Sequence, residues 1–392
     1  MKLGIFFLVV AYVLSQFYRA FLAVLSPVLG ADLGIGPDVL AFASGLWFLT
    51  FAAMQIPVGW ALDTIGPRRT AAWLLGIAGG GGALVFAMAS GAGAIYAAMV
   101  LIGIGCSPVL MAGYYIFGRI YPAAVFATLA GAMIGFGTLG NIAGAFPLAW
   151  AAQAFGWRGT MIALAVVTAL VAVALGLFIQ DPPKLEKTEG QKGALLDVLK
   201  IRELWLILPL MGVNYVPAAT MRGLWAGPFF ADVHGADSIA IGWVTLIMAI
   251  AMVIGSFAYG PLDRVFGTRK WVVLTGNLLG AACMLTLWAN PLMSYWSAAA
   301  LLALIGLFGA SFPMMVAHGR SFVPPHLLGR GVTLLNLFGI GGVGVMQTIS
   351  SRVHGAVAVP PVEAPYQAIF LLFGALLLLG CLIYLFSKDN TA

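Results

Sequence analysis

The sequence of 392 residues has little charge: only 8% of its residues are charged, whereas a typical soluble domain has about 25%. It also has only four histidines and three cysteines, and Cys106, Cys283 and Cys381 each fall inside an apolar run. The low charge excludes a water-soluble globular protein. The cysteine positions exclude a loop disulfide and a zinc site of ordinary spacing. We therefore predict neither a metal site nor a cofactor.

Apolar residues and glycine are abundant instead. Hydrophobic residues make up 62% of the chain, which also has 50 glycines and a mean hydropathy of +1.04. A transmembrane helix needs about 20 apolar residues, and small residues let such helices pack closely. The apolar runs of suitable length are 4–29, 40–62, 71–91, 95–117, 124–150, 158–180, 205–230, 240–262, 271–289, 295–317, 331–350 and 366–386. The sequence therefore predicts an all-α membrane protein with twelve transmembrane helices.

One polar stretch separates the first six apolar runs from the last six. We predict an N-terminal bundle over 1–180, a linker over 181–203 and a C-terminal bundle over 204–392. With a cytoplasmic N-terminus, most Lys and Arg residues fall inside and only Arg158 and Arg352 fall outside, as the positive-inside rule requires. The net charge of +6 therefore reflects membrane topology and not nucleic-acid binding. We expect a multi-pass protein of the plasma membrane, the inner membrane of a bacterium, with both termini cytoplasmic.

A short motif occurs twice, at matching places in the two halves. Residues 59–69 read GWALDTIGPRR after the second run, and residues 260–270 read GPLDRVFGTRK after the eighth. This motif resembles the signature loop of the major facilitator superfamily, which has the form G-x-x-x-D-(R)-x-G-(x)-R-[RK]. The resemblance implies two six-helix halves related by an axis along the membrane normal, with one substrate site near mid-membrane.

The acidic and basic residues of the two signature loops are candidates for a gate. We expect salt bridges and helix-terminus contacts there to hold the inward gate shut and to break in each transport cycle. The alternative is that the basic residues only fix the topology. The residues concerned are Asp63, Arg68, Arg69, Asp263, Arg264, Arg269 and Lys270.

Two arginines lie within apolar runs, Arg19 in the first and Arg222 in the seventh, both near the bilayer middle. Each costs roughly 2.5–3.5 kcal/mol on insertion scales, and every acidic residue lies in a loop or at a helix end. We predict that both guanidinium groups converge on a carboxylate, sulfonate or phosphate of the substrate. The pair resembles the arrangement in organophosphate:phosphate antiporters of the same superfamily. The alternative is that carbonyls, hydroxyls and trapped water satisfy both.

Other polar and aromatic residues of the spans are candidates for the same site. Gln16 shares a helix face with Arg19, and Tyr215 and Trp225 share one with Arg222. Tyr114 and Asn336 are further polar residues within spans, and we include them among the substrate-binding residues.

Coupling to protons needs a titratable group at membrane depth, typically Asp, Glu or His, and the sequence places none there. The drug/proton antiporter motifs of the superfamily are incomplete as well, because Met99 replaces an arginine and 137–141 lacks a proline. Drug/proton efflux is therefore disfavoured. A counter-transported anion or a co-transported proton or cation remains open.

We therefore predict a transporter, and not an enzyme, that moves a small organic or inorganic anion by alternating access as a monomer. One alternative is a copper importer, which would bind Cu(I) through thioethers such as those of Met248 and Met252. Another is a membrane receptor that does not transport.

Overall fold

The computed structural model describes residues 2–35, 37–144, 146–183, 195–236, 238–357 and 361–391. Every regular element in these ranges is helical, and none is a strand. Twelve helical stretches in the described part of the chain are long and apolar enough to cross a membrane. The predicted all-α fold with twelve transmembrane helices is therefore confirmed. Most of the predicted linker, 184–194, lies outside the described residues.

The contacts divide the chain into two compact units, and each contains one segment from the opposite half of the sequence. Unit 1 comprises Met1–Tyr121, Phe136–Val198 and Pro324–Leu334. Unit 2 comprises Pro122–Gly135, Leu199–Val323 and Leu335–Ala392. The division of the chain into 1–180 and 204–392 stays a prediction.

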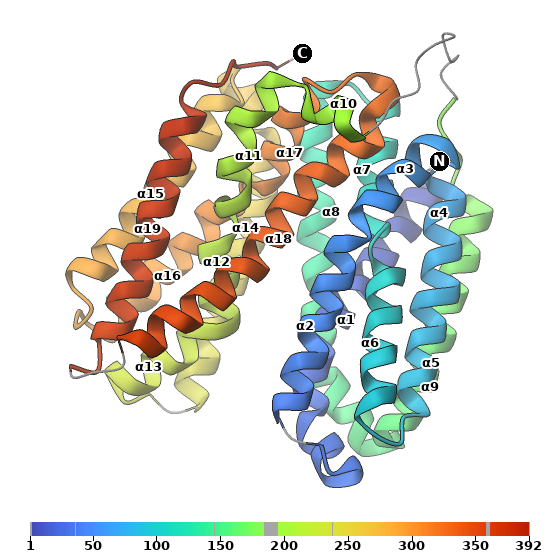
Figure 1. The fold of residues 1–392 in the computed structure, drawn as a ribbon, viewed down its shortest axis with the longest axis horizontal. Coiled ribbons are helices and arrows are strands. Elements are labelled where there is room, and N and C mark those ends of the chain that lie inside the picture. Colours follow the sequence, from blue (N-terminus) through green and yellow to red (C-terminus); the bar gives the residue numbers. More distant parts are fainter. Residues whose placement is uncertain are drawn as a thin grey trace. The chain divides into compact units, whose positions relative to one another are not determined.

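Unit 1 contains the helices of the first six spans. In it α1 packs against α9, and α2 packs against α6 (Figure 1). The elements are α1 (Lys2–Leu33), α2 (Pro37–Ala53), α3 (Gln55–Thr64), α4 (Pro67–Trp73), η1 (Leu74–Gly80), α5 (Gly81–Ala87), α6 (Ala92–Cys106), α7 (Val109–Ile120), α8 (Ala123–Ala143), α9 (Phe146–Phe178) and α10 (Leu195–Leu199). The larger part of α8, up to Gly135, belongs to unit 2.

Unit 2 contains the helices of the last six spans. Figure 1 shows α15 and α19 side by side, and α14 packs against α16. The elements are α11 (Arg202–Asn214), α12 (Val216–Thr220), η2 (Met221–Trp225), α13 (Ala226–His234), α14 (Ser238–Phe266), α15 (Lys270–Ala289), α16 (Tyr295–Gly309), α17 (Phe312–Arg320), η3 (Pro325–Leu327), α18 (Leu328–Ala356) and α19 (Ala364–Tyr384). The segment η3 and the start of α18 belong to unit 1.

Several predicted spans differ from the observed helices, and the fourth and tenth each divide in two, as α6 and α7 and as α16 and α17. The fifth was expected to continue to residue 150, but α8 ends at Ala143 and the next helix, α9, kinks at Gly156 with a φ of +73°. The seventh was expected to be one continuous helix, but it breaks at Tyr215, between α11 and α12. Pro217 stands in the first turn of α12, where a missing N–H is tolerated, so the chain restarts a helix there.

Each signature loop has a glycine with a positive φ angle at its turn. Gly66 has a φ of +104° and precedes Pro67, the first residue of α4. Gly267 in the second loop has a φ of +65°. Because glycine has no Cβ, it adopts positive φ at little steric cost, which explains its place in the motif.

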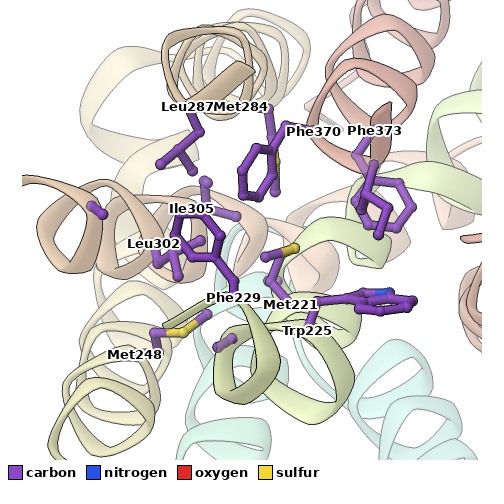
Figure 2. Packing of buried hydrophobic residues seen from close by; sticks show 14 of the residues in the cluster. Met221, Trp225, Phe229, Met248, Met284, Leu287, Leu302, Ile305, Phe370 and Phe373 are labelled. Atoms are coloured by element: carbon purple, nitrogen blue, oxygen red, sulfur yellow. The ribbon is translucent and has the colours of Figure 1, made fainter. Parts of the chain in front are cut away.

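The core of unit 2 is an apolar cluster of aromatic, aliphatic and methionine side chains (Figure 2). Met248 is fully buried in this cluster, together with Phe229 and Leu302. Methionine fills irregular gaps between helices, and that role accounts for Met248. No group of three or more His, Cys, Asp or Glu residues within the described ranges could hold a metal ion.

Candidate functional site

Arg19 lies on α1 against three aromatic rings of α2. Its guanidinium carbon is 5.3 Å from the ring centre of Trp47, 5.7 Å from that of Phe48 and 5.9 Å from that of Phe51. Aromatic faces attract a cation without accepting its conventional hydrogen bonds. The buried Nε of Arg19 has no hydrogen-bond partner among the described residues. Arg19 is therefore a charge held in place by rings, with a donor left unused.

These rings are positioned by close packing of α2 on α6. A Cβ at Gly103 would press on the backbone of Trp47, so glycine at this place on α6 lets the two helices approach. Trp47 is 1% exposed and stacks on Phe51 with ring centres 5.0 Å apart. Its buried indole Nε1 also has no partner in the described part of the chain. The sequence signal for this cluster, two adjacent aromatics and a third four residues after the first, was missed.

Arg222 lies in unit 2, on the irregular part of the seventh span. It belongs to η2, a π-helical turn that follows α12. Such turns are rare and often occur at functional sites. Within the described ranges, the buried Nε of Arg222 has no hydrogen-bond partner, and neither has the buried hydroxyl of Thr220. Arg19 and Arg222 belong to different units, so their joint action on one ligand stays a prediction.

The two other candidates of unit 1 are buried. Gln16 is 6% exposed, lies one turn from Arg19 on α1, and donates through Nε2 to the Tyr12 hydroxyl at 3.0 Å. Its Oε1 has no partner among the described residues. Tyr114 is fully buried on α7. Of this pair, Gln16 keeps one polar atom for a ligand beside Arg19.

The three other candidates of unit 2 have different surroundings. Trp225 lies in the apolar cluster and donates its indole N–H to Ser350 Oγ at 2.9 Å, so that donor is already used (Figure 2). Tyr215 is half-buried at the break between α11 and α12, with its ring 6.2 Å from that of Phe312. Asn336 on α18 is 1% exposed, and neither amide atom has a partner in the described part of the chain.

A buried polar network in unit 2 was missed by the sequence analysis. The Asn214 amide donates to Asn277 Oδ1 at 2.8 Å and to Ser311 Oγ at 2.7 Å. All three residues are at most 2% exposed and come from α11, α15 and the N-cap of α17. A polar residue in each of three apolar spans was the available signal, but nothing in the sequence says that these three meet. The network fixes α11 at the point where the seventh span breaks.

In the first signature loop, Asp63 binds the start of α18. Its carboxylate accepts hydrogen bonds from the backbone N–H groups of Gly329 at 2.7 Å and Arg330 at 3.2 Å. It also forms an ion pair with the Arg330 guanidinium at 3.0 Å, with the Asp63 side chain 3% exposed. A carboxylate at the first turn of a helix is stabilised by the free N–H groups and the helix dipole. Asp63 therefore holds a segment that lies about 266 residues away in sequence.

In the second loop, the carboxylate of Asp263 binds a residue of its own loop. Asp263 pairs with Arg269 of its own loop at 3.1 Å, and the two side chains are 2% and 1% exposed. The next residue, Arg264, donates to Thr128 Oγ1 on α8 at 3.1 Å, and Thr128 in turn donates to the Gly260 carbonyl at 2.9 Å. The early part of α8, which comes from the first half of the sequence, is therefore held to the second loop by the Thr128 hydroxyl and not by a carboxylate.

The helix that follows each loop is capped by an acidic residue from a later segment. Asp181, after α9, accepts the Arg68 N–H at 2.8 Å, and Asp389, after α19, accepts the N–H groups of Arg269 at 3.2 Å and Lys270 at 3.1 Å. Partial burial opposes ionisation of Asp389, but hydrogen bonds from Thr268 and these N–H groups outweigh it and lower its pKa. The remaining predicted residue, Arg69, is exposed.

A shallow cavity of about 540 Å³ lies in unit 1, around Asp32 and the kink of α9. Its charged groups are already satisfied by one another. Asp32 accepts hydrogen bonds from Arg158 and from Trp157 Nε1, and these bonds lower the pKa of the Asp32 carboxyl. Arg158 also donates to the Ala89 carbonyl at 3.1 Å. We therefore assign this cavity no binding role.

Comparison with known proteins identifies the family. A model described as "Major Facilitator Superfamily" matches residues 8–222 and 213–392. The chain is 24% identical to the putative transporter AraJ of Escherichia coli (strain K12) over 271 residues, which is 65% of either chain and so just under two thirds of that relative. It is 22% identical over 381 residues to a quinolone resistance transporter of Acinetobacter baumannii, covering 86% of this chain and 83% of that protein.

Two solved structures share the fold at 15% identity. The proton:xylose symporter XylE, bound to 6-bromo-6-deoxy-D-glucose, has a TM-score of 0.71 and covers 99% of this chain and 96% of its own. The human organic anion transporter MFSD10 (TETRAN) has a TM-score of 0.75, with coverages of 98% and 99%. The family match spans nearly the whole chain, so this protein is a multi-pass membrane transporter that belongs to the major facilitator superfamily.

Proposed function

We propose that this transporter moves a small organic or inorganic anion by alternating access, and that Arg19 and Arg222 bind it. The observation that carries the proposal is that each arginine lies within a membrane span and has a buried Nε without a partner among the described residues. Gln16, Tyr215 and Asn336 are the secondary contacts. We place Trp225 outside this set, because its N–H is already donated to Ser350.

Electrostatics gives the arginines their role. A charged group that is taken out of water without a partner costs several kcal/mol, and a bound oxyanion offsets this cost with charge-assisted, bidentate hydrogen bonds. Substrate binding also relieves repulsion between the two positive charges. An empty carrier is therefore expected to change conformation less readily than a loaded one.

The contact of Asp63 with Gly329 and Arg330 is the proposed gate of this cycle. It joins a residue of the second span to the start of the eleventh, so it must break whenever those segments separate. The distribution of Lys and Arg residues supports a cytoplasmic position for both signature loops and both termini, in the plasma membrane of a bacterium. The transporter is proposed to act as a monomer. It either exchanges its substrate for a second anion or transports a proton or cation together with the substrate.

Thermal unfolding of the detergent-purified protein with a ligand panel tests this function. The panel contains carboxylates, sulfonates, organophosphates, inorganic phosphate, a quinolone, neutral sugars and Cu(I). A ligand at 100 times its dissociation constant stabilises the protein by about 2.7 kcal/mol, which raises the unfolding midpoint measurably. We expect one anion class to stabilise the wild type and to lose this effect in both Arg19→Gln and Arg222→Gln.

Arg352→Gln is the matched control, because Arg352 is an exposed arginine on α18. It removes one positive charge and should leave the ligand shift unchanged. Stabilisation by neutral sugars or Cu(I) alone, equal in all four proteins, would overturn the anion proposal. Binding of an anion without its uptake into proteoliposomes would instead favour a receptor.

A further inference from the structure

The surroundings of Arg19 contain one positive charge and three aromatic rings. The rings of Trp47, Phe48 and Phe51 lie within 5.9 Å of the guanidinium carbon. Trp47 and Phe51 are 1% and 2% exposed, whereas Arg19 and Phe48 are half-buried and so remain reachable. Of the other described Lys and Arg residues of unit 1, Arg158 follows the kink of α9 and pairs with Asp32, and the rest lie at or near the ends of its spans.

We propose that the group bound at Arg19 is the carboxylate of an aromatic acid, with its planar ring against Phe48. This inference rests on the proposed function and narrows its substrate class. A carboxylate matches the planar fork of the Arg19 guanidinium, to which it can bind through two parallel hydrogen bonds. The carbon body of an aromatic acid then meets ring surfaces, which it contacts in offset or edge-to-face geometry.

The same surroundings disfavour inorganic phosphate. Phosphate at neutral pH carries between one and two charges and has four oxygens that need donors. Besides the Nε of Arg19, the unused hydrogen-bond donor near this arginine in the described part of the chain is the buried Nε1 of Trp47. Oxygens that face aromatic carbon would lose their hydration without a replacement, which is costly in a dry site.

The test measures affinities of benzoate, cyclohexanecarboxylate and inorganic phosphate for the intact protein by titration calorimetry. These three probes share an oxyanion and differ in ring and charge. Because an aromatic pair adds a contact beyond the area buried, we expect benzoate to bind about five- to tenfold tighter than cyclohexanecarboxylate. We expect phosphate to bind more weakly than either.

Phe48→Leu tests the ring itself, and Phe42→Leu is its control on the same helix. Phe48 is half-buried, so its loss should leave the fold intact, and Phe42 is 58% exposed and packs on Tyr96 away from Arg19. Phe48→Leu should bring the affinities of benzoate and cyclohexanecarboxylate close together, whereas Phe42→Leu should keep the wild-type ratio. Trp47→Phe keeps a ring and removes the N–H, so it should preserve most of the preference for benzoate.

The outcomes separate this inference from the proposed function. Equal binding of benzoate and cyclohexanecarboxylate, or tighter binding of phosphate, overturns the aromatic acid but leaves an anion transporter. A benzoate preference that survives Phe48→Leu overturns the assigned ring contact. If no anion in this set or in the wider panel binds, the proposed function fails and the inference fails with it.

Discussion

The two signature loops share two glycines, an aspartate and basic residues at the end, but their carboxylates bind different partners. Asp63 accepts N–H groups and an ion pair from the start of α18, whereas Asp263 pairs with Arg269 six residues ahead. The second loop contacts the other half of the sequence through Thr128, which donates a hydrogen bond to the Gly260 carbonyl. The two loops therefore supply one long-range contact in unit 1 and one local ion pair in unit 2, and both carboxylates are buried.

The two contacts differ in how easily they can open during a conformational change. A carboxylate bound to another segment can release it, because water can solvate both partners when they separate. A buried pair within one loop cannot open without leaving two charges in a poorly hydrated place. In the proposed transport cycle the first loop is the gate, and the second loop holds unit 2 together.

The largest expected effect comes from Asp263→Asn. The Arg269 guanidinium would stay buried without its carboxylate, and breaking such a pair costs about 3–5 kcal/mol. We expect a large fall in the thermal unfolding midpoint of the purified protein. The exchange of Asp63 for Asn is the comparison, and an equal fall in both variants would contradict the distinction between the two loops.

Asp63→Asn should act on opening more than on global stability. The change removes the charge that binds Gly329 and Arg330, and hydrogen bonds to charged groups contribute about 1.5–3 kcal/mol. We expect faster amide hydrogen exchange over 325–334, with a modest change in the unfolding midpoint. Unchanged exchange there would show that Asp63 does not hold this segment.

Asp389→Ala should loosen the first turn of α15. The carboxylate accepts two backbone N–H groups there, and loss of such a cap costs about 0.5–2 kcal/mol. Faster hydrogen exchange over 269–273 would report the loss. Asp181→Ala, which removes one N–H acceptor from α4, should have a smaller local effect.

The pH dependence of stability is a second test of the cap that Asp389 forms on α15. The folded pKa of Asp389 lies below its usual value of 3.8, so its contribution to stability is fully present above about pH 4. It is lost as the pH falls through the folded pKa. The difference between wild type and Asp389→Ala should therefore be present at pH 7 and shrink in acid. A difference that grows in acid would contradict this assignment.

The smallest expected effect is that of Thr128→Val. This nearly isosteric change removes the hydrogen bonds to Gly260 and from Arg264, with an expected loss of about 0.5–1.5 kcal/mol. We expect slightly faster hydrogen exchange at the start of α8. An effect as large as that of Asp63→Asn would mean that both loops act as gates of equal strength.

Much of the fold could be predicted because each span carries its own signal. An apolar run of sufficient length forms a helix in lipid whatever its neighbours are, since its backbone must satisfy its own hydrogen bonds. The break at Tyr215 was not predicted, although Pro217 follows it closely, because transmembrane helices tolerate proline. The kink at Gly156 falls between the fifth and sixth predicted runs, where a loop was expected and α9 continues instead.

The candidate site was predicted less completely. Arg19 and Arg222 stand out in the sequence because a charge in an apolar run is costly wherever it points. The rings around Arg19 do not stand out, because aromatic residues are common in any apolar span. The hydrogen bond from Trp225 to Ser350 could not be predicted either, since helical spacing gives a face but not what covers it.

The sequence by itself determined the twelve spans, the two intramembrane arginines and the two signature loops, because each depends on residues that are close together in the chain. Only the tertiary structure decided which partner each carboxylate takes. Asp63 and Asp263 are the carboxylates of two related motifs, and their bonds differ because different segments pack beside them. Contacts between segments far apart in sequence depend on packing, which a local pattern does not encode.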